Sequence, residues 1–351
     1  MNEIAKAILR WHENVIRDLP WKNSVDPYFI WVSEIILQQT RVEQGKPYYL
    51  RFIEKFPTVK DLAEASQEEV YKLWEGLGYY SRARNMHASA KHIHHELNGV
   101  FPSSYAELIK LKGIGPYTAA AIASFAFGED KAVLDGNVFR VLARLYNEDA
   151  YINENKNRKL FQGLVDNLLP KGMSASFNQA IMDFGSKFCA PSNPNCLECP
   201  LNEMCEGHRK GTVSVLPRKK KAKKKRIRYF YFLDLSPKTS LFPVVKRERK
   251  DIWQDLYSLP FIESPTELDN IELSDWEDCI GFNFGVQPQK VWEVKHMLSH
   301  QILHCRFYSS SILPSVKEDD ATYGKPSMKW ISDPSEVSFP VVISKYFNRV
   351  K

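Results

Sequence analysis

Hydrophobic periodicity divides the chain into a helical first part and a second part that contains strands. Near the start, Ile4, Ile8, Trp11 and Val15 recur at helical spacing, which predicts an amphipathic helix. Residues 27–42 predict a mostly buried helix, because their apolar side chains cover more than one face. The first part of the chain is therefore expected to build its core from packed helices.

The sequence LKGIGPY at 111–117 links a helical run over 105–110 to a small-residue helix over 116–127. Gly113 and Gly115 are expected to supply the φ > 0 backbone of the turn between them. The first amides of the second helix would then point toward a phosphate. This pattern predicts a helix-hairpin-helix that holds DNA by its backbone at Gly113 and Gly115. The alternative is a helical hairpin whose glycine turn serves packing alone.

Strand-like segments follow in the second part of the chain. Residues 229–235 and 241–246 are rich in aromatic and β-branched side chains. Residues 290–295 and 302–308 flank a polar turn, as the two strands of a hairpin would. The region 227–351 therefore predicts an α+β domain that is separate from the helices.

Composition and charge support two domains joined by a basic linker. The chain has 351 residues and a net charge of +6, but the segment RKKKAKKKRIR at 218–228 alone carries nine basic residues. The remainder is therefore slightly acidic, and the basic character is local. Such a segment suits a linker that tethers DNA, or a solvated linker that self-repulsion keeps extended. We predict a helical domain over 1–217, a linker over 218–226 and the α+β domain over 227–351.

Four crowded cysteines give the most specific local signal. Cys189, Cys196, Cys199 and Cys205 follow the spacing C-x6-C-x2-C-x5-C. Four thiolates suit tetrahedral zinc or an iron–sulfur cluster, and a single C-x2-C pair favours a [4Fe-4S] cluster. The chain shows no signal-peptide pattern and no apolar run of membrane-spanning length. A reducing cytoplasm is therefore the expected compartment, and a membrane is not an expected partner.

Two carboxyl groups are candidates for acid–base chemistry. Glu34 lies inside an apolar run, where burial would raise its pKa and suit it to act as a general acid near neutral pH. The commoner role for a helical glutamate is to face solvent. Asp135 follows Gly115 by one helix, so the chain can return it to the same DNA groove. The alternative is that Asp135 or Asn137 only caps the next helix.

A second glycine turn combines aromatic and basic residues. Its sequence is GLGYYSRARN at 76–85. Tyr79 is placed to wedge into a base stack, with Arg82 and Arg84 near phosphates. A tyrosine that merely packs within the loop is an equally good reading of Tyr79.

The whole chain resembles the MutY family of adenine DNA glycosylases, and its N-terminal half also resembles the wider endonuclease III superfamily. The motifs that carry this resemblance are SEIILQQTRVE (33–43), GLGYYSRARN (76–85), LKGIGPYTA (111–119), LDGNVFRVLAR (134–144), FNQAIMDFG (177–185) and the four-cysteine loop. The region 227–351 resembles the family's Nudix-like domain more weakly. It lacks the glutamate-rich box of nucleotide hydrolysis, so it would read the partner base.

The resemblance assigns roles to individual residues. It implies that Glu34 is the catalytic acid, that Asp135 stabilises the sugar cation, and that Tyr117 and Asn137 hold these two in place. It implies that Gln39 and Tyr79 insert beside the orphaned base, that Gln179 contacts the extruded adenine and that Ser299 reads 8-oxoguanine. Further expected substrate contacts are Trp21, Leu37 and His300. Leu298 stands where the family usually has an aromatic residue before that serine.

The function implied is base excision from double-stranded DNA. The enzyme would flip adenine out of a mispair with 8-oxoguanine or guanine and hydrolyse its glycosidic bond. For this chemistry we expect burial to raise the pKa of Glu34 and hydrogen bonds from neighbours such as Asn137 to hold down that of Asp135. The enzyme is expected to act as a monomer in the bacterial cytoplasm, at the nucleoid.

Two other functions compete with this one. Endonuclease III-type enzymes place a lysine nucleophile where Tyr117 stands, so tyrosine predicts base removal without strong strand cleavage. The first alternative is a bifunctional glycosylase and lyase that acts on damaged pyrimidines. The second is a DNA-binding protein with a structural metal site and no catalytic activity.

Overall fold

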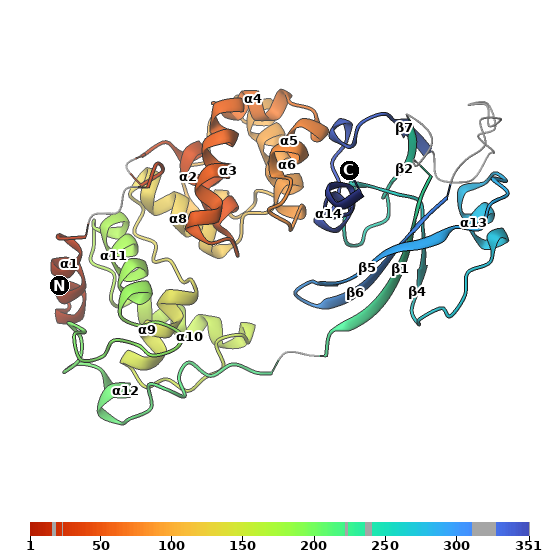
Figure 1. The fold of residues 1–351 in the computed structure, drawn as a ribbon. Coiled ribbons are helices and arrows are strands. Elements are labelled where there is room, and N and C mark those ends of the chain that lie inside the picture. Colours follow the sequence, from red (N-terminus) through yellow and green to blue (C-terminus); the bar gives the residue numbers. More distant parts are fainter. Residues whose placement is uncertain (16–18, 23, 222–223, 236–240, 311–327, 351) are drawn as a thin grey trace. The chain divides into compact units, whose positions relative to one another are not determined.

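The computed structural model describes the chain except for residues 16–18, 23, 222–223, 236–240, 311–327 and 351 (Figure 1). Its internal contacts form two compact units. The first comprises residues 1–65 and 84–221, and the second comprises residues 66–83 and 222–351. None of the described helices combines the length and apolarity needed to cross a membrane.

The first unit is built from helices, as the periodicity predicts. These are α1 (Glu3–His12), α2 (Pro27–Leu37), α3 (Val42–Lys55), α4 (Val59–Glu64), most of α6 (Ser81–Glu96), α7 (Tyr105–Leu108), α8 (Pro116–Phe127), α9 (Gly136–Leu145), α10 (Asn155–Asp166), α11 (Ser174–Lys187) and α12 (Glu206–Arg209). Two predicted helices are shorter than expected. The first ends before Val15, and α2 ends at Leu37 because Gln39 adopts a left-handed φ of 57° that no helix continues through.

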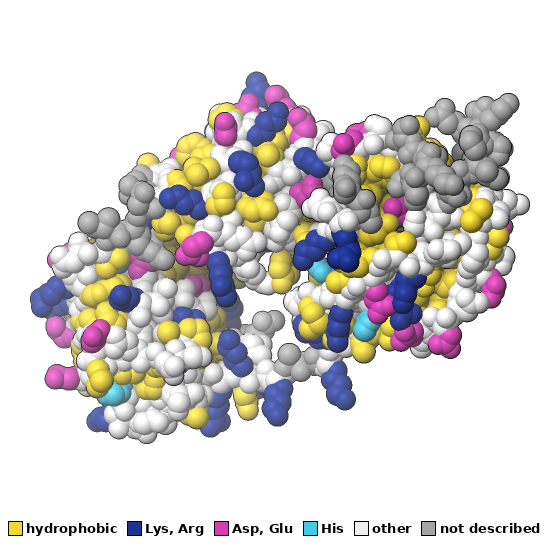
Figure 2. All heavy atoms as spheres, viewed as in Figure 1, with side chains coloured by type: hydrophobic (Ala, Val, Ile, Leu, Met, Phe, Trp, Pro, Cys, Tyr) yellow, Lys and Arg dark blue, Asp and Glu magenta, His cyan; other side chains and the backbone are white. Residues whose placement is uncertain are grey.

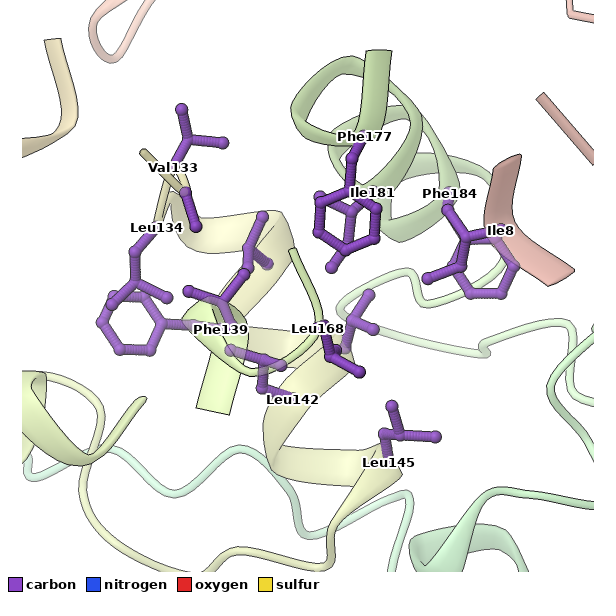
Figure 3. Close-up of a cluster of buried hydrophobic side chains, with 14 of the residues drawn as sticks. Ile8, Val133, Leu134, Phe139, Leu142, Leu145, Leu168, Phe177, Ile181 and Phe184 are labelled. Carbon is purple, nitrogen blue, oxygen red and sulfur yellow. The ribbon is translucent and has the colours of Figure 1, made fainter. Parts of the chain in front are cut away.

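The core of this unit lies between α1, α8, α9, α10 and α11. Figure 3 shows part of it, with Phe139 and Leu142 from α9 and Phe177 and Ile181 from α11. Helix α8 is buried along its small residues Ala119–Ala123, which allow it to pack closely against α2 and α11. This packing fixes the N-terminus of α8 and the polar residues that flank it.

The predicted helix-hairpin-helix is present, but its two glycines differ. Gly113 has a φ of 83°, and a Cβ there would lie 2.6 Å from the Cβ of Asn85. Gly115 contradicts the prediction of positive φ, because it is the extended N-cap of α8 with a φ of −91°. A Cβ at Gly115 would meet nothing within 4 Å. Neither backbone strain nor packing therefore requires glycine at this position.

The second unit has the predicted α+β content. It contains α5 (Gln67–Trp74), β1 (Arg226–Asp234), β2 (Phe242–Lys246), β3 (Tyr257–Ser258), β4 (Phe261–Ser264), α13 (Leu273–Ile280), β5 (Gln289–Met297), β6 (Gln301–Ser309), β7 (Met328–Ile331), a 3-10 turn (Pro334–Glu336) and α14 (Val341–Val350). One sheet has the order β4-β1-β6-β5, in which β1 and β6 are parallel and the other pairs antiparallel. The other sheet has the order β3-β2-β7.

Strands β5 and β6 form the hairpin that the sequence predicts. Met297 pairs with Ile302, and the amide of Leu298 donates to the carbonyl of Gln301 at 2.9 Å. Only two residues, Ser299 and His300, are left to make the turn. The side chains of β6 alternate between buried and partly exposed positions, so this register is fixed by the core of the unit.

The basic linker begins as an ordered segment on the helical unit. The carbonyl of Arg218 accepts from the amide of Ile152 at 3.1 Å, and the amide of Lys220 donates to Asn153 Oδ1 at 2.9 Å. The Arg218 guanidinium lies 3.3 Å from Asp149. Lysine and arginine side chains gather along the described parts of this segment in Figure 2. Its first residues are therefore not free in solvent, and residues 222–223 lie outside the described part.

Candidate active site

A cavity of about 940 Å³ opens in the helical unit, between α2, the N-termini of α8 and α9, and α11. It brings together predicted site residues from distant parts of the sequence. Those that line it are Trp21, Glu34, Leu37, Gln39, Gly115, Tyr117, Asp135, Asn137 and Gln179. Gly113 lies outside this lining.

Glu34 occupies the wall that α2 contributes. Its neighbours Ser33, Ile35 and Ile36 along the helix are buried, and the Glu34 side chain lines the cavity. Burial raises the pKa of Glu34 to about 7, and the negative charge of Asp135 adds to this shift. A hydrogen bond with Tyr117 acts in the opposite direction. The predicted high pKa is therefore present, and at neutral pH a large fraction of Glu34 carries a proton to donate.

Asp135 is the N-cap of α9, so both roles considered for it hold together. Its Oδ1 accepts from the amides of Asn137 at 2.9 Å and Val138 at 2.8 Å, and its Oδ2 accepts from Asn137 Nδ2 at 2.6 Å. These bonds act to lower its pKa, as expected, but the expected net lowering is wrong. Burial raises the pKa of Asp135 above its usual value, although the hydrogen bonds and the charge of Arg140 oppose the shift.

Asn137 is itself fixed from two sides. Its Oδ1 accepts from Arg140 Nη2 at 2.6 Å, and the same guanidinium donates to the carbonyls of Gly185 at 3.1 Å and Cys189 at 2.8 Å. A Cβ on Gly185 would lie 2.9 Å from the carbonyl oxygen of Asn137. Glycine at this point of α11 therefore allows the close approach that holds Asn137, and through it Asp135, in place.

Tyr117 completes the group around Glu34. Its hydroxyl lies 3.5 Å from Met182 Sδ and also bonds to Glu34. Burial and the nearby charges of Glu34 and Asp135 raise the pKa of Tyr117 well above its usual value. The side chain is thus a neutral hydrogen-bond donor, and it has no amine with which to attack a sugar.

The wall of the cavity that α11 contributes carries a polar group that the sequence analysis did not single out. Asp183 Oδ2 accepts from His12 Nε2 at 3.0 Å, Lys22 Nζ at 3.3 Å and Gln179 Nε2 at 3.3 Å. Asp183 belongs to the motif FNQAIMDFG, one helical turn after Gln179. That i, i+4 spacing on one helix could have identified the pair. No sequence spacing indicates that His12 and Lys22 contact Asp183, because both lie far from it along the chain.

Two predicted DNA contacts belong to the second unit. Tyr79 is 45% exposed and lies in the left-handed region with a φ of 48°, directly after Gly78. Exposure suits a side chain that inserts into DNA. Arg82 is turned into its own loop, where it donates to the carbonyl of Gly78 at 3.3 Å and lies over the ring of Trp74. Its role as a phosphate contact stays a prediction.

The remaining predicted reader residues form the β5–β6 turn. Ser299 and His300 are both exposed, and Ser299 Oγ lies 3.0 Å from His300 Nδ1. When the hydroxyl donates to that nitrogen, the lone pairs of Oγ remain available to a donor on DNA. Leu298 packs against the core of the unit.

The four cysteines form one loop on the helical unit. Their thiols are partly buried, and each of Cys199 and Cys205 interacts electrostatically with other thiols of the set, which places the four in mutual range. Arg144 Nη1 donates to Cys189 Sγ at 3.3 Å and to the carbonyl of Ala190 at 2.8 Å. A buried cation beside clustered thiols fits a group held by thiolates. Within the described residues, no three metal-ligating side chains are arranged to hold a single ion.

Comparison with known proteins identifies the family of this chain. Residues 32–167 match the model of the HhH-GPD superfamily of base excision DNA repair proteins. An adenine DNA glycosylase of Buchnera aphidicola subsp. Baizongia pistaciae is 35% identical over 99% of this chain and 96% of its own length. The chain belongs to the MutY family of adenine DNA glycosylases. Human adenine DNA glycosylase is 40% identical over 58% of this chain and 39% of the human protein.

Solved structures agree on the fold of the helical part. A thermostable thymine-DNA glycosylase is 31% identical, with a TM-score of 0.55 over 59% of this chain and 95% of that protein. A non-covalent endonuclease III–DNA complex gives a TM-score of 0.51 over 59% of this chain and 94% of that protein, at 22% identity. Both confirm the helix-hairpin-helix glycosylase fold. Because the first of these two structures is a thymine-DNA glycosylase, the fold alone does not determine which base an enzyme removes.

Proposed function

We propose that this MutY-family protein is a monofunctional DNA glycosylase that removes adenine mispaired with 8-oxoguanine or guanine. The observation that carries the proposal is the shared cavity of Glu34 and Asp135, in which the pKa of Glu34 is about 7. The names of relatives such as the Buchnera enzyme support adenine as the base. The division of labour between two carboxyl groups parallels that of glycosidases.

In the proposed mechanism, adenine is first extruded from the duplex into the cavity. A mispaired adenine is the least costly base to extrude. Protonated Glu34 donates to N7 of adenine, which turns the base into a neutral leaving group. As the glycosidic bond lengthens, ionised Asp135 stabilises the positive charge that develops on the sugar. Glu34, now deprotonated, activates the water that completes hydrolysis.

The monofunctional assignment depends on Tyr117. Endonuclease III, whose trapped covalent intermediate with DNA has a similar helical fold, is an enzyme that bonds to DNA. A lysine amine at this position would form a Schiff base and lead to strand cleavage. The buried hydroxyl of Tyr117 instead bonds to Glu34, and that favours hydrolysis without cleavage.

Recognition of the partner base is proposed for the β5–β6 turn of a Nudix-like domain. 8-Oxoguanine differs from guanine in carrying a hydrogen on N7, which a hydroxyl oxygen can accept. Ser299 Oγ is exposed at the tip of the hairpin and suits this contact, with His300 beside it. Insertion of Gln39 and Tyr79 beside the orphaned base remains part of the proposal, as does phosphate binding at Gly113 and Gly115.

The cysteine loop is proposed to hold a [4Fe-4S] cluster through Cys189, Cys196, Cys199 and Cys205. The single C-x2-C pair favours a cluster over zinc. Such a group would cross-link the loop on the helical unit. Arg144 supports this loop from the core side by its bonds to Cys189 and Ala190. Action as a monomer in the bacterial cytoplasm stays a prediction.

The experiment that tests the function is a single-turnover assay on matched duplexes. Each duplex carries adenine opposite 8-oxoguanine, guanine, cytosine or thymine. We expect free adenine from the first two, an intact strand before alkali treatment, and no covalent adduct after borohydride reduction. A further duplex that carries a damaged pyrimidine tests the bifunctional alternative, which release of that base with a trapped adduct would establish. A colourless protein that only binds DNA would establish the structural alternative.

A further inference from the structure

The polar wall of the cavity contains a buried carboxylate that the mechanism does not use. Asp183 is only 4% exposed, and one of its oxygens accepts from His12, Lys22 and Gln179 at 3.0–3.3 Å. The side chains of His12 and Lys22 are each 16% exposed. All four residues line the same cavity as Glu34. Three donors that converge on one oxygen form a built site rather than a surface ion pair.

The chemistry of Asp183 forces the orientation of the Gln179 amide. The ammonium of Lys22, 3.3 Å away, favours the ionised form of the carboxyl. An ionised carboxylate accepts hydrogen bonds and donates none. Gln179 must therefore turn its NH2 group toward Asp183, because its carbonyl oxygen would be repelled there. The negative charge of Asp183 therefore selects one of the two possible orientations of the Gln179 amide.

This orientation leaves the carbonyl oxygen of Gln179 for the base. Among the described residues, none donates a hydrogen bond to Gln179 Oε1, and the side chain lines the cavity. Adenine carries an amino donor at C6, whereas guanine and hypoxanthine carry a carbonyl acceptor there. A fixed acceptor therefore attracts adenine and repels a purine with a carbonyl at that position.

We propose that Asp183 is a positioning residue for base specificity, which locks the Gln179 amide with its oxygen toward the base and so selects a purine that bears a 6-amino group. The inference rests on the proposed function, since it concerns the base that the same cavity receives. Lys22 and His12 contribute indirectly, because they bind the Asp183 carboxylate and so keep it in position beside Gln179.

The test compares excision of adenine and hypoxanthine opposite 8-oxoguanine under single-turnover conditions. In the variant Asp183→Asn, the new amide can donate as well as accept, so the Gln179 amide is free to turn over. We expect the ratio of adenine to hypoxanthine rate constants to fall about tenfold, the effect of about one positioned hydrogen bond. An equal loss on both bases would show that Asp183 is merely structural and would overturn the inference.

A double variant provides the rescue. The carboxylate introduced by Gln179→Glu is an acceptor at both oxygens, so it needs no orientation by residue 183. Combined with Asp183→Asn, it also returns a carboxylate to the reach of Lys22. We expect this double variant to fold and to recover the preference for adenine. If the double variant folds without recovering that preference, the inference is wrong even should Asp183→Asn alone fail to fold.

The matched control is Asp166→Asn. Asp166 accepts from the Gln162 amide at 2.9 Å with the same i, i+4 spacing, but it is exposed on α10 and outside the cavity. This variant should leave both rate constants unchanged. The wild-type protein separates the two levels of failure. If it releases no adenine, the proposed function fails. If it releases adenine and Asp183→Asn keeps its base ratio, only the inference fails.

Discussion

The cavity of the helical unit and the β5–β6 turn of the second unit present their functional groups in opposite ways. In the cavity, Glu34 and Asp135 come from distant segments, and burial raises the pKa of both. In the turn, Ser299 and His300 are adjacent in sequence and exposed to solvent. The two carboxyl groups of the cavity are buried, whereas the two polar side chains of the turn are exposed to solvent.

The difference follows from what each region has to do. Proton transfer near neutral pH needs a carboxyl group whose acidity has been altered, and low-dielectric surroundings alter it. Recognition of a base in DNA needs groups that another molecule can reach. Changes to the catalytic pair in the cavity should therefore slow adenine release opposite either partner base alike, while changes in the turn should act on the choice of partner base. The predictions below test that separation.

The largest effect is expected from Glu34→Gln. Glutamine is nearly isosteric but cannot donate the proton that makes adenine a leaving group. The single-turnover rate constant should fall about a thousandfold, by the same factor opposite 8-oxoguanine and guanine. DNA affinity, measured by fluorescence anisotropy, should stay within about twofold. A near-normal rate would show that Glu34 is not the acid.

The pH profile of the wild-type protein should show the next largest effect. The protonated form of Glu34 is the active one, and its pKa is about 7. Its fraction is close to complete below that pH and falls about tenfold per unit above it. The rate constant should therefore decline on the alkaline side with either partner base. A profile that rises from about pH 7 to about pH 9 would contradict this assignment.

The sequence predicted which residues line the cavity better than it predicted their pKa shifts and polar contacts. The apolar residues around Glu34 predicted its burial, and the position of Asp135 before a helix predicted an N-cap. The sign of the shift in the Asp135 pKa was missed because the spacing of Asp135 and Asn137 indicates their hydrogen bonds. The burial that outweighs these bonds arises only when α9 packs into the core of the helical unit. For Asp183, the spacing to Gln179 was available in the sequence but was not used, and its other partners His12 and Lys22 lie far away in sequence.

Local geometry set a second limit on prediction. The pattern of small and apolar residues indicated the bounds of α8, but Gly115 proved to be extended, because an N-cap residue needs no positive φ. Likewise, α2 stops at Leu37 although the sequence predicted a helix through residue 42, since Gln39 adopts a left-handed φ. Such departures from pattern occur beside the site, where backbone conformation serves function.

Tyr117→Phe should produce a smaller effect that distinguishes two parts of the cavity. The hydrogen bond from Tyr117 lowers the pKa of Glu34, so its removal should raise that pKa further. The alkaline limb of the pH profile should move upward by about half a unit, with a several-fold loss in the plateau rate constant. Strand cleavage should remain absent. A limb that moves to lower pH would mean that Tyr117 acts on Glu34 in the opposite sense.

Ser299→Ala is the smallest expected change and the sharpest test of the separation. The variant removes one acceptor at an exposed turn, which is worth about 1 kcal/mol, or about fivefold. That loss should appear only with adenine opposite 8-oxoguanine, because guanine has no hydrogen on N7 to donate. The ratio of the single-turnover rate constants for the two mispairs should fall about fivefold, with an unchanged pH profile.

The same turn supplies a matched control for this variant. His300→Gln keeps the Ser299 hydroxyl at the tip of the hairpin, so it should preserve most of the preference for 8-oxoguanine over guanine. If Ser299→Ala slowed adenine release from both mispairs equally, the turn would contribute to DNA binding in general. The separation between a catalytic pair withdrawn from water and a reader displayed to DNA would then fail, because both regions would act on every mispair alike.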